Sequence, residues 1–332
     1  MMKAQTISQF GDPSVFQSAM IEKPSVIPGH VLIKVAATSV NQIDCKIRSG
    51  AVSAIAPAFP AVLHGDVAGT IVAVAEDVKN FKVGDEVYGC AGGIKGTVGG
   101  ALAEFMLADA YLLALKPSSY SMLEAAALPL VGITAWEALF VKGHLRAGMT
   151  ILIHGGLGGV GHIAVQLAKY SGAKVFTTVL NPADFTLAKS LGADEVINAK
   201  EESVENYVQR LTQGKGFDFV FDTVGGPNLD KSLAAAAIRG HVITTAARTT
   251  HDLSPLHNKA LSLHVVFMLL PLMEGRGREG HGEILTELAK VVEQGKLKVL
   301  LDKNQFTLDT VSNAHALLES GKARGKVGIS IV

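Results

Sequence analysis

The stretch 39–50, SVNQIDCKIRSG, places side chains that could do chemistry directly after an apolar run. Asn41 and Asp44 offer oxygen atoms that could begin a metal site, and Lys46 adds a cation. The same order suits the start of a helix, because Asn is a good N-cap and Asp in the first turn interacts favourably with the helix dipole. Asp44 and Arg48, four residues apart, could pair on such a helix. A metal site and a helix start both remain open at this point.

His64 and Asp66, two positions apart, could supply two further metal ligands, and the chain has two cysteines, Cys45 and Cys90. A tetrahedral zinc site needs three or four converging ligands, so we expect no bound zinc. For His64 we favour a buried, hydrogen-bonded role, with a place in the substrate cleft as the alternative. We expect both cysteines to be small buried packing residues.

A second informative stretch is HGGLGGVGHIAVQLAK. It contains Gly156-x-Gly158-x-x-Gly161 after a strand-like run and opens a segment with helical spacing. These are the surroundings of a dinucleotide-binding fingerprint, in which the backbone approaches a pyrophosphate and the helix N-terminus offers N–H groups. A turn that only packs helix on strand is the alternative. The predicted cofactor contacts of this loop are Gly156, Gly158, Gly159, Val160 and Gly161.

Strand-like and helical segments alternate around this loop. The strand-like runs lie at 151–155, 173–180, 194–198 and 217–226. The helical patterns lie at 161–172, 182–193 and 202–214. This alternation predicts an α/β domain with a doubly wound parallel sheet. Before it come short β-branched runs at 30–40, 68–76 and 85–90, and after it come helical patterns at 284–297 and 308–325 with a closing strand at 326–332.

Composition limits the possible partners. The chain has 332 residues, about enough for two domains. Lys+Arg and Asp+Glu are both 30, and this balance argues against a nucleic-acid or acidic-membrane surface. The beginning of the sequence has no signal-peptide core. The most apolar stretch of the whole chain, 261–273, is too short to cross a bilayer. We expect a cytoplasmic protein that acts on a small molecule.

The choice of dinucleotide depends on the end of the second strand. NAD-binding folds usually place an acid about 20 residues after the fingerprint, to bond the ribose hydroxyls. The segment 177–181, TTVLN, has no acid that would repel a 2′-phosphate, and no Lys or Arg is plainly placed to bind one. We assign Thr178 and Asn181 to this part of the site. We expect NADP(H), with NAD(H) as the alternative.

The whole chain resembles a zinc-independent medium-chain dehydrogenase/reductase of the quinone oxidoreductase (zeta-crystallin-like) family. The matching stretches, in family order, include VNQIDCKIRSG, HGDVAGTIVAV, FKVGDEVYG, GALAEFMLA, GGLGGVGHIAVQLAK, FDTVGG and ARGKVGISIV. The resemblance implies a GroES-like β-rich catalytic domain at 1–123 and 296–332, with a Rossmann domain at 124–295. Related zinc alcohol dehydrogenases have Cys in place of Asn41 and His in place of Gly65, so the resemblance implies no zinc.

The resemblance also implies roles for individual residues. The loop at Asn41 would face the nicotinamide, with the Asn41 amide on the substrate oxygen. Lys46 matches the enone and alkenal reductases, and its ammonium would stabilise the anion that hydride transfer leaves. With Asp44 these residues form the predicted catalytic set. Further cofactor contacts are implied for Thr134, Asp222, Val224 and Lys326.

Two departures concern the adenosine side of the cofactor. Relatives that use NADP(H) often have Lys where this chain has Asp184, and Tyr where it has Ala199. The resemblance therefore leaves open how this chain binds that side.

We expect a reductase that passes hydride from NADPH to a quinone or an α,β-unsaturated carbonyl. A non-catalytic NADPH-binding protein, as in lens crystallins, and an enoyl-thioester reductase are the alternatives. The apolar stretch 263–269 predicts a strand near the edge of the Rossmann sheet. Because an uncovered edge favours pairing with a second copy, we predict a homodimer.

Overall fold

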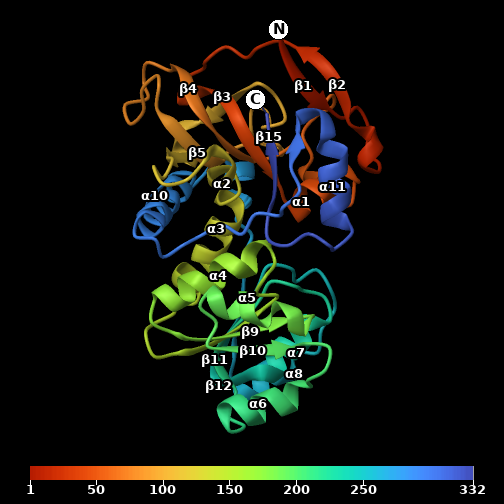
Figure 1. Ribbon diagram of the computed structural model, residues 1–332, viewed down its shortest axis with the longest axis vertical. Helices are drawn as coiled ribbons and strands as arrows, with labels where there is room; N and C mark the ends of the chain where they lie inside the picture. The colour runs from red at the N-terminus through yellow and green to blue at the C-terminus, as the bar shows by residue number, and fades with distance from the viewer. Residues whose placement is uncertain (332) are drawn as a thin grey trace. The chain divides into compact units, whose positions relative to one another are not determined.

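The computed structural model describes residues 1–331. The chain divides into two compact units, one formed by Met1–Ile133 with Leu269–Val332 and the other by Thr134–Met268 (Figure 1). Both ends of the chain thus contribute to the first unit, and the second unit is continuous. The division predicted from the sequence, 1–123 with 296–332 and 124–295, stays a prediction.

The first unit is built on a mostly antiparallel sheet in the order β14-β15-β3-β4-β5-β7, with β6 also paired to β3. Its strands are β3 (His30–Val40), β4 (Asp66–Val74), β5 (Glu86–Cys90), β6 (Phe105–Asp109), β7 (Leu113–Leu115), β14 (Phe306–Thr307) and β15 (Val327–Ser330). β1 (Met2–Thr6) and β2 (Gln17–Ile21) form a separate pair. The helices of this unit are α1 (Gln42–Arg48), α2 (Met122–Ala126), α9 (Leu270–Glu274), α10 (Glu279–Glu293) and α11 (Val311–Glu319).

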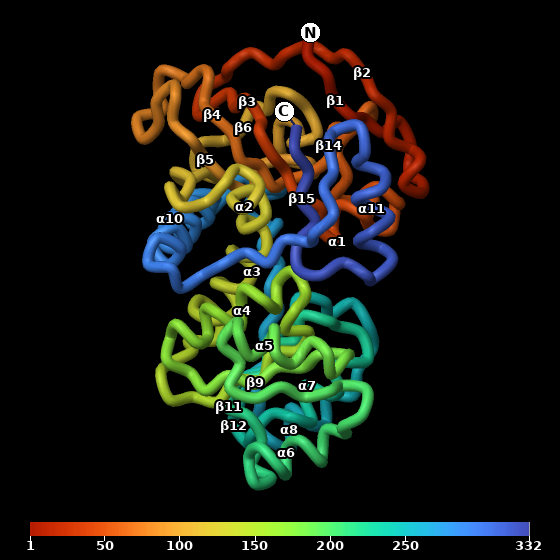
Figure 2. Tube along the Cα trace, in the orientation of Figure 1, coloured from red at the N-terminus to blue at the C-terminus, as the bar shows by residue number. Residues whose placement is uncertain are grey.

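The last strand of this unit lies beside one of its first. β15 pairs antiparallel with β3, with Val327 opposite Val40 (Figure 2). Lys326, directly before β15, therefore comes to the end of β3, where α1 begins.

Helix α10 packs within the first unit. It contacts β7 and the 3₁₀ turn η3 (Ala110–Leu112), and Tyr88 Oη donates a 2.6 Å hydrogen bond to the carbonyl of Leu285. The boundary proposed from sequence at 295/296 assigns α10 to the other domain. In the structure α10 belongs to the first unit, because its apolar face packs on the β-rich core of that unit.

The second unit contains a parallel sheet in the order β10-β9-β8-β11-β12-β13. Its strands are β8 (Thr150–His154), β9 (Lys174–Val179), β10 (Glu195–Asn198), β11 (Phe217–Asp222), β12 (Ala236–Thr244) and β13 (Ser262–Val265). Its helices are α4 (Gly159–Tyr170), α5 (Phe185–Ser190), α6 (Val204–Thr212), α7 (Asn228–Ala235) and α8 (Ser254–Lys259); α3 (Pro129–Trp136) runs across the unit boundary. Numbered along the chain, this order is 3-2-1-4-5-6, the dinucleotide-binding arrangement. The predicted doubly wound sheet is confirmed.

The central strands are apolar because they are buried on both faces. Phe176, Phe217 and Val220 are almost fully buried in a core that includes Leu229 and Leu233 of α7. The edge strand β13 is shorter than the predicted 263–269, ending at Val265 before the chain turns into α9. No helix within residues 1–331 has the length and apolar character needed to span a membrane.

Candidate active site

The predicted helix start at Asn41 is confirmed. Asn41 is the N-cap of α1, and its N–H donates a 2.7 Å hydrogen bond to the carboxylate of Asp44. The considered pair between Asp44 and Arg48 does not form. Arg48 is buried and pairs instead with Glu319 at the end of α11, because α11 packs directly on α1. Asp44 therefore bonds to Asn41, and Arg48 pairs with Glu319.

The side chain of Asn41 takes part in a buried polar cluster rather than capping the helix. Its Nδ2 donates to Asp66 Oδ2 at 2.8 Å, and its Oδ1 accepts from Lys326 Nζ. Asp66 Oδ2 also accepts from Ser39 Oγ at 2.8 Å, and Asp66 Oδ1 accepts from the N–H of Leu130 at 2.8 Å. Asn41, Asp66 and Lys326 are 6%, 0% and 2% exposed. We call Ser39, Asn41, Asp66 and Lys326 the Asn41 cluster.

Asp44 lies beside this cluster and carries an unusual carboxyl. It is 2% exposed, and burial raises its pKa to about 7, with the charge of Asp66 acting in the same direction. The hydrogen bond from Asn41 N–H and the charge of Lys326 oppose this rise. The carboxyl of Asp44 thus binds the backbone N–H of Asn41, the residue whose side-chain amide is the predicted catalytic group.

Lys46 is exposed on α1, as is Gln42 one turn before it. The buried residues of this helix are Asp44, Cys45, Ile47 and Arg48. Lys46 therefore lies outside the Asn41 cluster, and its contact with a substrate stays a prediction.

His64 is buried and hydrogen-bonded, as expected. Its ring contacts His315 and Thr38, and the Nδ1 of His315 lies 3.4 Å from Cys45 Sγ. Cys45 and Cys90 are buried free thiols, and burial raises the pKa of Cys45 to about 12. Within residues 1–331, no three His, Cys, Asp or Glu side chains are grouped as a metal would require.

The glycines of the loop 156–161 differ in how much room a side chain would have at each position. A Cβ on Gly156 would lie 2.0 Å from Thr177 Oγ1, and one on Gly161 would lie 2.1 Å from the carbonyl oxygen of Gly155. Both glycines are thus required by packing. A Cβ on Gly158 would meet nothing closer than 3.3 Å, and its φ of −75° suits any residue. A ligand that approaches the N-terminus of α4, where Gly159 and Val160 follow, explains this third glycine.

Thr178 holds the loop from the neighbouring strand. Its Oγ1 accepts the N–H of Gly155 at 3.0 Å and lies 3.4 Å from Nδ1 of His154. His154 is 3% exposed, and burial lowers its pKa to about 4. Asn181 instead caps the next 3₁₀ turn, accepting from the N–H of Ala183.

Asp222 ends β11 and organises the loop that follows it. Its Oδ1 accepts from the N–H groups of Val224 and Gly225 and from Asn228 Nδ2. Val224 is exposed and Thr134 is buried. Loop packing thus explains Asp222, whereas contacts of these residues with the cofactor stay predictions.

A cavity of about 460 Å³ lies at the carboxyl ends of β8, β9 and β10. In a parallel sheet of this order, such a crevice is where dinucleotides bind. The lysines that line it were missed from the sequence, because their place depends on how the loops fold back. Its lining includes His154, Thr178, Ala199, Lys200, Asn228 and Lys231.

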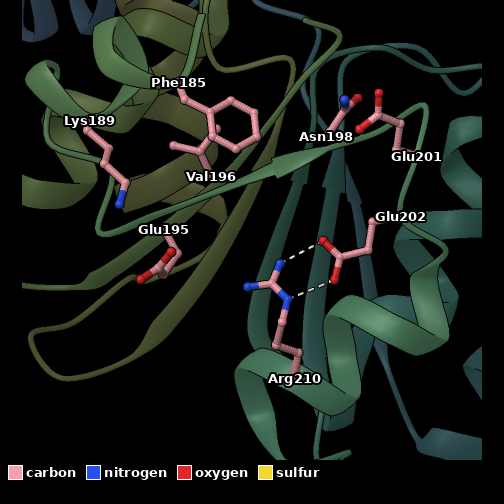
Figure 3. Close-up of a pocket in the computed structure, with 8 residues that line it drawn as sticks. All are labelled: Phe185, Lys189, Glu195, Val196, Asn198, Glu201, Glu202 and Arg210. Atoms are coloured by element: carbon pink, nitrogen blue, oxygen red, sulfur yellow. Dashed lines mark hydrogen bonds and ion pairs between the residues drawn. The ribbon is translucent and has the colours of Figure 1, made fainter. Parts of the chain in front are cut away.

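A second cavity, of about 510 Å³, is lined from α5, β10 and α6 (Figure 3). The guanidinium of Arg210 donates two hydrogen bonds, of 2.8 and 2.6 Å, to the carboxylate of Glu202. Figure 3 draws both as dashed lines. Phe185 and Val196 form its apolar part. Lys189, Glu195 and Glu201 also line this cavity, so its lining carries both signs of charge and indicates no ligand class.

Comparison with known proteins gives the family. The alcohol dehydrogenase GroES-like domain model matches residues 27–118, and the zinc-binding dehydrogenase model matches residues 159–273. The chain is 34% identical to 2-methylene-furan-3-one reductase of Solanum lycopersicum, over 99% of this chain and 79% of that protein. It is 30% identical to quinone oxidoreductase of Homo sapiens, over 98% and 97%. The chain belongs to the quinone oxidoreductase family of medium-chain dehydrogenases and reductases.

Solved structures agree with this family. An alcohol dehydrogenase superfamily protein from Novosphingobium aromaticivorans aligns with a TM-score of 0.95 at 39% identity, covering 100% of both chains. A quinone oxidoreductase from Escherichia coli complexed with NADPH aligns with a TM-score of 0.86 at 28% identity, covering 99% of both. The family, the two-part fold and an NAD(P)H-dependent oxidoreductase activity are thus confirmed.

Proposed function

We propose that this chain is a zinc-independent reductase that uses NADPH to reduce a quinone or an α,β-unsaturated carbonyl. The observation that carries the proposal is the glycine loop at the N-terminus of α4, where a Cβ on Gly158 would lie 3.3 Å from the carbonyl oxygen of Gly155, against 2.0–2.1 Å to the nearest atom for Gly156 and Gly161. The names of the tomato and human relatives support the two substrate classes.

The residues present fit a dinucleotide. The α4 N-terminus and the loop 156–161 would hold its pyrophosphate, and the cavity at Thr178 and His154 would take the adenosine side. Lys200 and Lys231 line that cavity together with Glu201, Glu202 and Glu205. We assign the two lysines to a 2′-phosphate, in place of the contacts missing at Asp184 and Ala199, with the glutamates opposing that charge. When bound, the dihydronicotinamide supplies a hydride.

The protein's own contribution is to position the substrate and stabilise charge. Hydride addition to the electrophilic carbon moves an electron pair onto the substrate oxygen. Asn41 would donate an N–H to that oxygen, and Lys46, if the predicted contact holds, would add an ammonium. A proton from water then completes reduction of the carbonyl compound, so that one hydride and one proton are consumed in each turnover.

The test uses chelator-treated protein with NADPH and a panel of quinones and enones, followed by NADPH absorbance. We expect turnover without added metal. Activity that disappears on chelation and returns with zinc would contradict the proposal. Tight NADPH binding without turnover on any electrophile would indicate the non-catalytic alternative.

The cofactor assignment has its own test. Lys200→Met combined with Lys231→Met should raise the KM for NADPH about tenfold or more and leave that for NADH nearly unchanged, since one charge-assisted contact is worth roughly 1.5–3 kcal/mol. An equal rise for both cofactors would place the 2′-phosphate elsewhere.

We also propose a cytoplasmic homodimer. β13 is an edge strand of the second unit; its last residue, Val265, is 45% exposed, and Phe267, two residues beyond its end, is 36% exposed. Pairing of two such edges would cover both. Sedimentation at micromolar protein concentration should give twice the chain mass, and a monomer there would contradict the dimer.

A further inference from the structure

Three oxygen atoms surround the ammonium of Lys326, two from the adjacent residues Val40 and Asn41 and one from Asp66. Nζ donates to Asn41 Oδ1, lies 3.3 Å from the carbonyl oxygen of Val40 and lies 3.5 Å from Asp66 Oδ2. A backbone carbonyl, an amide oxygen and a carboxylate are the ligand types of a hard cation. Here a side chain 2% exposed supplies that cation.

The counterion of Lys326 is Asp66, which is also enclosed by hydrogen-bonding groups. Asp66 is fully buried and accepts hydrogen bonds from Ser39 Oγ, Asn41 Nδ2 and the Leu130 N–H, each at 2.8 Å. A buried ion pair is weak evidence for stability, because the cost of removing both charges from water can exceed their attraction. The pair therefore calls for a reason other than folding.

Asn41 lies between the two charges. Lys326 binds its oxygen, and Asp66 takes one of the two hydrogens on its nitrogen. The second hydrogen is the one that a substrate oxygen would accept, in competition with the carboxyl of Asp44, which also bonds the Asn41 side chain. A cation on an amide oxygen draws electron density from the nitrogen, so the remaining N–H becomes a stronger donor.

We propose that Lys326 and Asp66 are positioning residues that orient and polarise the Asn41 amide toward the substrate oxygen. This inference deepens the proposed function and rests on it. In this proposal the ammonium of Lys326 acts on the substrate through the Asn41 amide. The resemblance instead implied that Lys326 contacts the cofactor. Loss of one preorganised donor typically lowers kcat by about 100-fold to 1,000-fold.

The first test is Lys326→Ala with and without methylammonium. We expect kcat to fall about 100-fold, the KM for NADPH to change little, and added methylammonium to restore part of kcat by entering the vacated space. Lys34→Met, which removes an exposed lysine from β3, the strand that pairs with β15, is the control and should keep full activity. Full kcat in a folded Lys326→Ala protein would overturn the inference, as would a loss that methylammonium leaves unchanged.

A second variant guards against misfolding. Asp66→Asn with Lys326→Met removes both charges together, so no uncompensated charge stays buried. We expect a melting temperature close to that of the parent but the same loss of kcat as Lys326→Met alone. Recovered kcat in the folded double variant would mean that the charges only offset one another.

A spectroscopic readout separates this inference from the proposed function. The side-chain amide protons of Asn41, assigned through Asn41→Asp, should resonate downfield in the parent and move upfield in Lys326→Met. That measurement needs no turnover, so it stands even if no quinone or enone is reduced. An unchanged resonance in the folded variant would overturn the polarisation, whatever the substrate.

Discussion

His64 Nε2 and His315 Nε2 lie 2.9 Å apart in the interior of the first unit. Thr38 Oγ1 donates to the Asp66 carbonyl at 2.6 Å, so it must accept from Nδ1 of His64. His64 Nε2 is then an acceptor, and His315 donates to it. Cys45 in turn donates to His315, and one direction of donation runs through the whole chain of contacts.

This pair predicts acid sensitivity. Burial lowers the pKa of His315 to about 3 and that of His64 well below its usual value, so both rings are neutral when folded. The unfolded chain takes up protons near pH 6.5, and stability therefore falls as pH drops from about 6.5 towards 3, by about 1.4 kcal/mol per pH unit for each proton. The nearby charges are Lys326, Asp66, Asp44, Arg48 and Glu319.

The check is a series of melting curves from pH 7 to pH 4. His315→Gln should show a shallower loss than the parent, because one titrating ring is gone. His257→Gln, at an exposed position on α8, is the control and should follow the parent. Equal slopes in parent and His315→Gln would contradict the assignment.

Asp44 predicts the opposite trend. Because burial raises its pKa to about 7, the folded chain keeps a proton that the unfolded chain has already released. Stability from this group is therefore present at low pH and is lost as pH rises from about 4 to 7. Asp44→Asn should be more stable than the parent at pH 8 by on the order of 1–3 kcal/mol, and not at pH 4. Denaturant titrations at both pH values measure this, and a uniform change would count against it.

The glycine loop offers a matched pair of variants. Gly156→Ala should lose about 1–3 kcal/mol of stability, because its Cβ would overlap Thr177 Oγ1 at 2.0 Å. Gly158→Ala should fold nearly as well as the parent but bind NADPH at least tenfold more weakly. Thermal melts and fluorescence titration with NADPH separate the two effects. Unchanged NADPH binding in Gly158→Ala would remove the ligand reason for that glycine.

Lys46→Met tests the predicted electrophile. If Lys46 stabilises the anion formed by hydride transfer, kcat should fall about 100-fold with NADPH affinity almost unchanged. Gln42→Ala, on the same exposed side of α1, is the control. An unchanged kcat would make Lys46 a surface charge and leave the oxyanion to Asn41.

Much of the fold could be predicted from short stretches of the sequence taken one at a time. β3 has the predicted bounds 30–40, because a β-branched run between turn signals needs no distant partner to be recognised. The alternation of strands and helices likewise predicted the parallel sheet.

Contacts between distant segments could not be predicted in this way. Lys326 and Asn41 are 285 positions apart, and Arg48 and Glu319 are 271 apart. Asp66 was considered only as an incidental metal ligand, since neither spacing nor residue type marks a carboxylate that will bind an amide and an ammonium. The pairing of β15 with β3 creates those contacts.

The division of the first unit between the two ends of the chain has a consequence for synthesis on the ribosome. The continuous segment 134–268 emerges before β15, so β3 can pair with β4 and β6 early but with β15 only after that segment has been made. Until then Asp66 has no ammonium beside it and α1 has no α11 to cover it. The nascent chain can therefore fold its Rossmann unit before Lys326 joins Asn41 and Asp66.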